Sequence, residues 1–237
     1  MELTKIIKKN GGKFLHLYDL VYKTKNGNDK VYEMISRNDD LRTANDVTND
    51  KVRGAVILAV TDDEKILINK EFRMACNSYI YNLPAGLIEE GETPEEAAKR
   101  ELFEETGMEM TDVIAVSRPY FTADGYTNER SVMVFCRVKG EPTNKNESED
   151  EEITPMLIDA NEARKILYTD ENLCGTRTQL ILTFWTLLDR IGDIIENKDD
   201  WKSRLFQLYI INMSNRKGGS HNVGWALGYW YSYWRTW

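Results

Sequence analysis

The chain has 237 residues, of which 41% are hydrophobic and 30% charged, a composition typical of one large folded domain or of one domain with an appendage. Runs of about 18 consecutive apolar residues are absent, which excludes a membrane-spanning helix. The formal net charge of −8 disfavours binding of nucleic acid through a basic surface, and the presence of only two histidines excludes a multi-histidine zinc site.

The first fifty residues predict a small β-structure. Residues 13–23 are rich in β-branched and aromatic side chains, an Asn-Gly pair follows, and residues 30–37 alternate between apolar and polar types. Together they predict a β-hairpin. Residues 38–51 are polar, and we expect a loop there. Residues 1–50 are therefore assigned to an N-terminal hairpin region.

Short apolar runs bounded by turn residues predict six more strands. They are residues 54–60, 65–72, 79–84, 112–118, 131–138 and 153–158. An acidic loop, residues 141–152, precedes the last of them, and two helices are predicted after it, at 160–168 and around 176–195. Strands and helices do not alternate regularly, so we expect an α+β fold with helices packed on a mixed sheet.

The clearest helix is predicted between Thr93 and Gly107. Thr93 is suited to the N-cap and Pro94 to the first helical position, and Glu96, three residues after Thr93, completes a capping box. Gly107 follows Thr106 and favours the end of the helix.

Three carboxylates recur on this predicted helix. Glu101, Glu104 and Glu105 stand at i, i+3 and i+4, so their side chains project from neighbouring positions of one face. Carboxylate oxygens are the ligands that Mg²⁺ and Mn²⁺ prefer, so a divalent-cation site is one interpretation of the pattern. A solvated acidic face is the other.

The residues around these carboxylates carry a longer pattern. Residues 86–108 read GLIEEGETPEEAAKRELFEETGM, which resembles the Nudix box, the signature of the Nudix hydrolase superfamily. The positions that match are Gly86, Glu92, Arg100, Glu101, Leu102, Glu104, Glu105, Gly107 and Met108. Every position of the signature is present.

The resemblance implies a mixed sheet sandwiched between helices and an enzyme that hydrolyses a nucleoside diphosphate linked to another moiety. It implies that Glu101 and Glu105 are metal ligands for Mg²⁺ or Mn²⁺. Glu104 is then a further ligand or, with Glu105, a catalytic carboxylate. Metal ions neutralise the charge of a diphosphate and lower the pKa of a bound water, and a carboxylate accepts the proton of that water.

Beyond the box, the chain resembles the ADP-ribose pyrophosphatase branch, which carries an N-terminal hairpin before the hydrolase domain. Pro84-Ala85-Gly86 matches the start of the box in that branch, and this implies that the carbonyl of Ala85 is a metal ligand. The branch usually has Glu two residues before that proline, whereas this chain has Asn82.

Three other segments carry the branch resemblance and supply the remaining site residues. Glu71-Phe72-Arg73 resembles a branch strand that ends in Gln-Tyr-Arg, and residues 119–129 resemble its downstream proline-containing loop. An acidic loop in the branch provides a glutamate that handles water. The residues implied are Arg73, Gly125 and Glu129 for substrate binding and Glu151 for catalysis.

We therefore expect a Mg²⁺-dependent hydrolase that cleaves a nucleoside diphosphate sugar, with ADP-ribose giving AMP and ribose 5-phosphate, and that works as a homodimer. Other Nudix substrates, such as dinucleotides or NTPs, remain alternatives, as does a non-catalytic nucleotide sensor. The hydrolase domain is assigned to residues 51–197. Residues 198–237 form a tail of unassigned role, whose aromatic end, 225–237, suits core packing, a partner interface or a stacking surface.

The number and spacing of the cysteines indicate whether the protein works in a reducing or an oxidising compartment. Cys76, Cys136 and Cys174 are far apart and odd in number, so they form neither a disulfide framework nor a metal-binding spacing. The first residues lack the apolar core of a secretory signal. We expect a cytoplasmic protein with a small-molecule substrate and without nucleic-acid or membrane partners.

Overall fold

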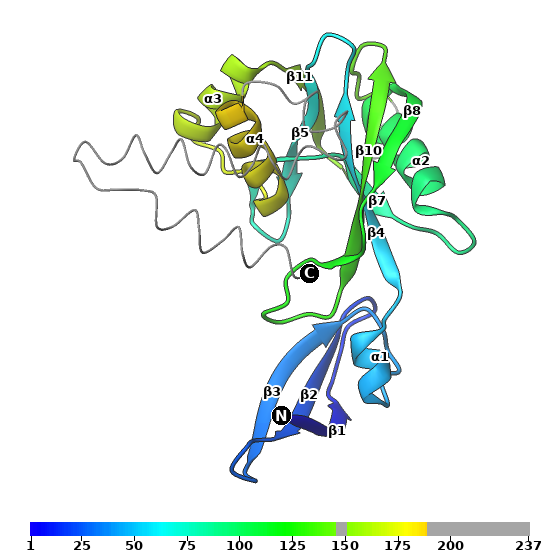
Figure 1. Ribbon diagram of the computed structural model, residues 1–237, viewed down its shortest axis with the longest axis vertical. Coiled ribbons are helices and arrows are strands. Elements are labelled where there is room, and N and C mark those ends of the chain that lie inside the picture. The colour runs from blue at the N-terminus through cyan, green and yellow to red at the C-terminus, as the bar shows by residue number, and fades with distance from the viewer. Residues whose placement is uncertain (146–150, 189–237) are drawn as a thin grey trace, which may run out of the picture. The chain divides into compact units, whose positions relative to one another are not determined.

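Two β-sheets and four helices make up the part of the chain that the structure describes, residues 1–145 and 151–188 of a computed structural model (Figure 1). The N-terminal sheet consists of β1 (Glu2–Lys8), β2 (His16–Lys23) and β3 (Asp29–Ser36). The larger sheet consists of β4 (Val52–Val60), β5 (Ile66–Arg73), β6 (Ser78–Asn82), β7 (Ala85–Leu87), β8 (Glu109–Val116), β9 (Tyr120–Phe121), β10 (Arg130–Lys139) and β11 (Ile153–Ile158). The helices are α1 (Ala44–Thr48), α2 (Pro94–Thr106), α3 (Ala160–Tyr168) and α4 (Thr176–Leu188).

The predicted N-terminal hairpin is confirmed, since β2 and β3 pair antiparallel around a turn in which Gly27 has a φ of 79°. A third strand, β1, pairs with the other edge of β2 and was not predicted. Lysines interrupt its apolar alternation, and only Leu3 and Ile6 pack against the buried side chains of the sheet. The pattern is too weak to indicate a strand without its partner.

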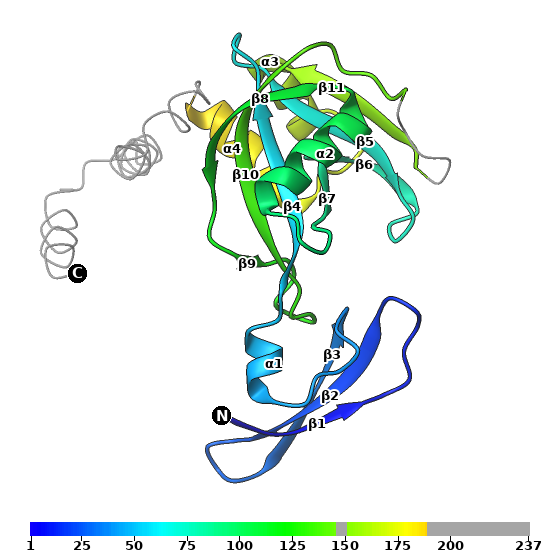
Figure 2. The same ribbon diagram turned by 90° about the vertical axis from the view of Figure 1, so that its right-hand side faces the viewer.

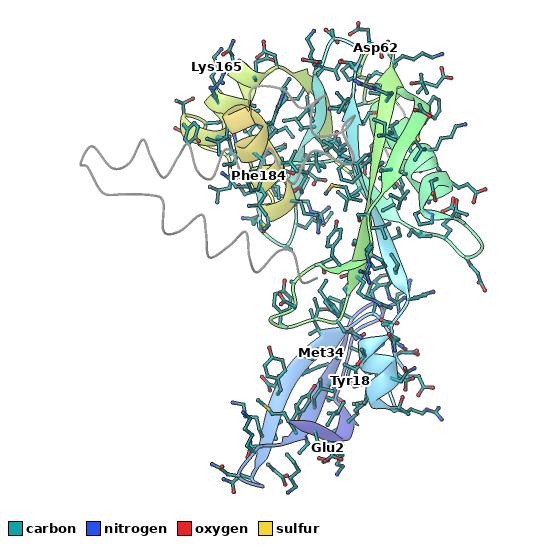
Figure 3. All side chains as sticks on the ribbon, viewed as in Figure 1. Glu2, Tyr18, Met34, Asp62, Lys165 and Phe184 are labelled. Atoms are coloured by element: carbon teal, nitrogen blue, oxygen red, sulfur yellow. The ribbon has the colours of Figure 1, made fainter. Side chains whose placement is uncertain are left out.

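A small core lies on the N-terminal sheet. Tyr18, Leu20, Met34 and Leu41 are buried there, and Figure 3 labels Tyr18 and Met34 on the sheet. The prediction of a loop at residues 38–51 is wrong for residues 44–48, which form α1. In that segment a capping box of Thr43 and Asp46 starts a single short helical turn, which has too few residues to show a helical period.

The larger sheet is mixed, as expected. Its main strand order is β11-β5-β4-β10-β8, with β4 and β10 parallel and the other neighbours antiparallel. The short strands β6, β7 and β9 pair antiparallel with β5, β4 and β10, respectively. The six predicted strands are all present, while β7 and β9 have too few residues to show an alternating pattern.

Helices cover both faces of the larger sheet (Figures 1 and 2). On one face α2 contacts β4, β7 and β8; on the other, α3 and α4 pack against each other and against β11 and β6. The helices predicted at 94–106 and 160–168 are confirmed. The helix predicted at 176–195 is confirmed to Leu188, and its last residues lie outside the described part, as does the tail at 198–237.

The first turn of α4 is hydrogen-bonded to the segment that leads into β7. The backbone N–H of Leu83 donates to Oγ1 of the buried Thr178 at 2.9 Å, and the N–H of Gly175 donates to the carbonyl of Tyr81 at 2.8 Å. The start of α4 therefore holds in place the end of β6 and the segment between β6 and β7. Among the described residues, no helix has the length and apolar character that crossing a membrane requires.

Candidate active site

The residues of the predicted signature form a strand, a loop and the helix α2. β7 pairs antiparallel with β4, so that Val56 lies opposite Ala85 and Gly54 opposite Leu87. The helix then begins at its N-cap, Thr93, whose side chain accepts from the N–H of Glu96 at 3.2 Å. It ends at Gly107, which has a φ of 65°, a left-handed conformation that favours glycine. This arrangement places the helix next to the strand that carries Ala85 and Gly86.

Gly86 and Glu101 are in direct contact across this arrangement. A Cβ built on Gly86 would lie 1.8 Å from Cδ of Glu101, which no side chain can tolerate without displacement. The glycine therefore lets the carboxylate of Glu101 lie against the strand. This contact gives the physical reason for glycine at the first position of the box.

Arg100 ties the loop to the helix. Its Nε and Nη2 donate to both carboxylate oxygens of Glu92 at 2.8 and 2.9 Å, and Nη2 also donates to the carbonyl of Leu87 at 3.0 Å. Nη1 donates to Glu101 at 2.8 Å and to Glu104 at 3.2 Å. The hydrogen bonds from Arg100 are the main reason that the pKa of Glu92 falls to about 2.

The three helix carboxylates have different surroundings. Glu104 has a side chain that is 54% exposed, whereas that of Glu101 is 17% exposed. Glu105 is half-buried, and its Oε2 accepts a 2.7 Å hydrogen bond from Nδ2 of Asn69 on β5. The structure therefore brings Glu101 and Glu105 toward the sheet and leaves Glu104 at the surface, although the spacing alone placed all three on one face.

Burial is the main reason that the pKa of Glu105 rises to about 8, and the charges of Glu71 and Glu101 contribute to the same rise. Burial also raises the pKa of Glu101, while its hydrogen bond to Arg100 opposes this shift. Half-buried carboxylates that repel one another are a donor set that fits a hard divalent cation. Across residues 1–145 and 151–188, no three His, Cys, Asp or Glu side chains stand in an arrangement ready to hold a metal ion.

Strand register separates two neighbouring glutamates, Glu151 and Glu152, just before β11. Ile153 lies opposite Glu71 on β5, so alternation places Glu151 on the side of the sheet where Glu71 lies and Glu152 on the other. On that other side, Tyr79 Oη donates to the carboxylate of Glu152. The exposed Glu151 contributes to the raised pKa values of both Glu101 and Glu105.

The residues predicted to bind substrate fall into two places. Arg73 lies at the end of β5, mostly exposed, with Nη1 3.6 Å from Oε2 of Glu71. Gly125 and Glu129 lie instead against the N-terminal sheet. Tyr32 Oη donates to the carbonyl of Gly125, and Nε of Arg37 donates to Oε1 of Glu129 at 3.1 Å.

Two residues near the carboxylates were not predicted. Asn69 is 1% exposed and follows the apolar residues 66–68 on β5, so a buried polar side chain inside an apolar run was the available signal. Glu71, two residues further, was noted only as part of a motif. Its Oε1 accepts a hydrogen bond from Nδ2 of Asn82, the residue that departs from the expected pattern.

Comparisons with known proteins identify the family to which this chain belongs. The sequence matches the NUDIX domain over residues 50–173, just over half of the chain. It is 29% identical over 189 residues to a nudix hydrolase of Caenorhabditis elegans, covering 78% of this chain and 76% of that protein. It is 35% identical over 120 residues to an ADP-ribose pyrophosphatase of Bacillus subtilis, covering 50% of this chain and 64% of that protein.

Among solved structures, the fold is similar to that of an ADP compounds hydrolase, with a TM-score of 0.56 at 19% identity, covering 78% of this chain and 94% of that one. The chain belongs to the Nudix family. Its signature is intact and lies on a loop and helix packed against a mixed sheet, so the protein is a pyrophosphohydrolase of that family, with ADP-ribose pyrophosphatases among its relatives.

Proposed function

We propose that the protein hydrolyses the diphosphate linkage of a nucleoside diphosphate sugar, with ADP-ribose cleaved to AMP and ribose 5-phosphate. The observation that carries the proposal is the pair of half-buried carboxylates, Glu101 and Glu105, at the strand–helix junction of a Nudix fold. Relatives named ADP-ribose pyrophosphatase, from Bacillus subtilis and Saccharomyces cerevisiae, support this substrate class.

The cation in this proposal is Mg²⁺ or Mn²⁺, held by Glu101 and Glu105 with Glu104 and the carbonyl of Ala85. A bound divalent cation supplies charge neutralisation at the diphosphate and lowers the pKa of water. Gly86 keeps Glu101 against β7, and Asn69 holds one oxygen of Glu105, so both carboxylates are positioned by the fold.

Glu151 is proposed to accept the proton of the attacking water. Support comes from the strand register, which puts Glu151 on the side of Glu71 and Glu105, whereas Glu152 is directed to Tyr79 on the opposite side. The mutual repulsion between Glu151 and the helix carboxylates favours a shared proton or cation among them. Proton transfer by a positioned carboxylate contributes about 10²- to 10⁴-fold to such reactions.

Substrate contacts are proposed for Arg73, Gly125 and Glu129. Residues 1–50 are proposed to build the homodimer, because this region exposes apolar side chains such as Phe14, in the loop before β2, and Val31 on β3. Residues 51–197 then form the hydrolase domain. A cytoplasmic location is supported by three free cysteines, which fit a reducing compartment.

The decisive experiment is product analysis with Mg²⁺ and a panel of ADP-ribose, other sugar nucleotides, dinucleotides and NTPs. The proposal expects AMP and ribose 5-phosphate from ADP-ribose, with the highest kcat/KM among the sugar nucleotides. A dinucleotide or an NTP with a much higher kcat/KM would overturn the substrate class and leave the Nudix chemistry in place. Turnover of none of the panel would favour a nucleotide-sensing role.

A further inference from the structure

One carboxylate next to the helix is not part of the signature. Glu71 lies on β5 two residues after Asn69, so the two side chains share one face of the strand. The hydrogen bond from Asn69 to Glu105 shows that this face is directed at α2. The side chain of Glu71 is 13% exposed, and its charge helps to raise the pKa of Glu105.

Asn82 holds Glu71 in this position. Asn82 lies directly opposite Asn69 on the paired strand β6, which places it diagonally from Glu71, and its Nδ2 donates to Oε1 of Glu71. The other amide atom of Asn82 is confined by Gly175, where an added Cβ would lie 1.9 Å from Oδ1. The amide is therefore fixed on both sides and orients the carboxylate. The second oxygen of Glu71 has only a long contact, 3.6 Å, with the exposed Arg73.

A second, independent feature points to a polar ligand at this place. Asn69 is 1% exposed, and its Oδ1 has no hydrogen-bond partner among the residues that the structure describes, although its Nδ2 is bonded to Glu105. Leaving a buried amide oxygen unpaired costs about 1–3 kcal/mol, so such groups are normally satisfied by water or a ligand. Cations such as Mg²⁺ usually keep several coordinated waters, and a cation bound beside the carboxylates would bring such waters near the Oδ1 of Asn69.

We propose that Glu71 supplies an additional carboxylate to the divalent-cation site, with Asn82 as its positioning residue. The proposal rests on the cation site of the proposed function and adds a donor from β5 to those from α2 and β7. Glu71→Gln removes the charge of the proposed ligand and Asn82→Leu removes the amide donor that holds it, each with little change in side-chain shape. A pair of isosteric substitutions therefore tests the assignment.

The experiment is calorimetric titration of the full chain with Mn²⁺ alone, together with melting of the metal-free proteins. Glu71→Gln is expected to weaken Mn²⁺ binding by about 10-fold or more, as loss of a ligand or its close support typically does. Asn82→Leu keeps the carboxylate of Glu71 but removes the amide donor that orients it, and is expected to weaken Mn²⁺ binding by less than Glu71→Gln does. Glu90→Gln, an exposed residue of the box loop, is the matched control and is expected to bind like the wild type.

The outcomes separate this inference from the proposed function. Wild-type Mn²⁺ affinity in Glu71→Gln, with a large loss in Glu105→Gln, would overturn the role of Glu71 and leave the helix site standing. Wild-type affinity in Glu105→Gln would overturn the cation site itself. A lower melting temperature in Glu71→Gln with unchanged Mn²⁺ affinity would show a structural role only. Wild-type Mn²⁺ affinity in Asn82→Leu would remove the role given to Asn82.

Discussion

The carboxylate of Glu101 lies against the backbone of Gly86, so closely that a methyl group on the glycine would overlap its Cδ at 1.8 Å. The contact between strand β7 and helix α2 at this place therefore depends on glycine having no side chain at position 86. Any residue larger than glycine must either move the carboxylate or separate the helix from the strand.

Gly86→Ala is therefore expected to displace Glu101 and to lower both Mn²⁺ affinity and turnover by about 10-fold or more. Isothermal titration with Mn²⁺ and steady-state rates with ADP-ribose measure the two effects. Gly12→Ala is the control, since a Cβ there meets its nearest atom at 3.8 Å, an ordinary contact. Unchanged affinity in Gly86→Ala would mean that Glu101 does not ligate the cation from this position.

Glu105→Gln is expected to stabilise the metal-free protein while weakening cation binding. The pKa of Glu105 is raised from 4.5 to about 8 in the folded chain, so the folded state holds this proton more tightly than the unfolded state. The stability that this proton contributes is complete below pH 4.5 and is lost as the pH rises through 8. A glutamine at this position cannot ionise, so the Glu105→Gln variant does not lose this stability as the pH rises.

Thermal melts with a chelator present measure this effect. At pH 9 the melting temperature of Glu105→Gln is expected to exceed that of the wild type by about 3 °C or more. The difference is expected to shrink toward pH 4.5. A lower melting temperature for the variant at pH 9 would show that the carboxylate of Glu105 is stabilised by its surroundings rather than strained by burial and like charges.

Glu151→Gln and Glu152→Gln form a matched pair of adjacent substitutions. Loss of a general base is expected to reduce kcat by about 10²-fold or more in Glu151→Gln, with little change in the Mg²⁺ concentration required. Glu152→Gln is expected to keep most of the activity, because Glu152 is directed to Tyr79 on the opposite side of the sheet. Rates across a Mg²⁺ titration distinguish the two. A collapse in Glu152→Gln alone would assign the proton transfer to that residue.

The N-terminal region, residues 1–50, is expected to form a dimer interface. Phe14 and Val31 are 64% and 55% exposed, and apolar side chains of this kind are enriched where proteins meet. The double variant Phe14→Ser/Val31→Ser is expected to shift the protein toward monomer, as measured by light scattering at micromolar concentration. Leu173→Ser, at an exposed apolar residue before α4, is the control. A wild-type protein that is monomeric at this concentration would contradict the prediction.

The features that the sequence predicts correctly are those set by neighbouring residues in the chain. The helix α2 is bounded by the capping box of Thr93 and by Gly107, and both signals lie within a few residues of the ends that they define. The positions of Glu101 and Glu105 follow from the same helix. By contrast, β1 depends on pairing with β2, and a strand whose lysines face solvent carries little signal of its own.

The contribution of β5 to the site could not be predicted for a similar reason. Asn69 and Glu71 reach the carboxylates only because β5 turns one face toward α2, and these two elements are far apart in the sequence. The neighbouring Asn82 looked like a missing carboxylate in the sequence. In the folded chain its amide holds the carboxylate of Glu71, which is a relationship between two strands rather than a property of either.

The hydrogen bond from Leu83 to Thr178 bears on where a working fragment of this protein can end. The similarity to the NUDIX domain ends at residue 173. Thr178, whose hydroxyl accepts the hydrogen bond from the N–H of Leu83, lies beyond that residue. A fragment cut at that boundary would leave the N–H of Leu83 without its buried acceptor and would also lose the Gly175 contact with Asn82. A fragment meant to fold on its own is therefore expected to need α4 as well as the residues that match the family.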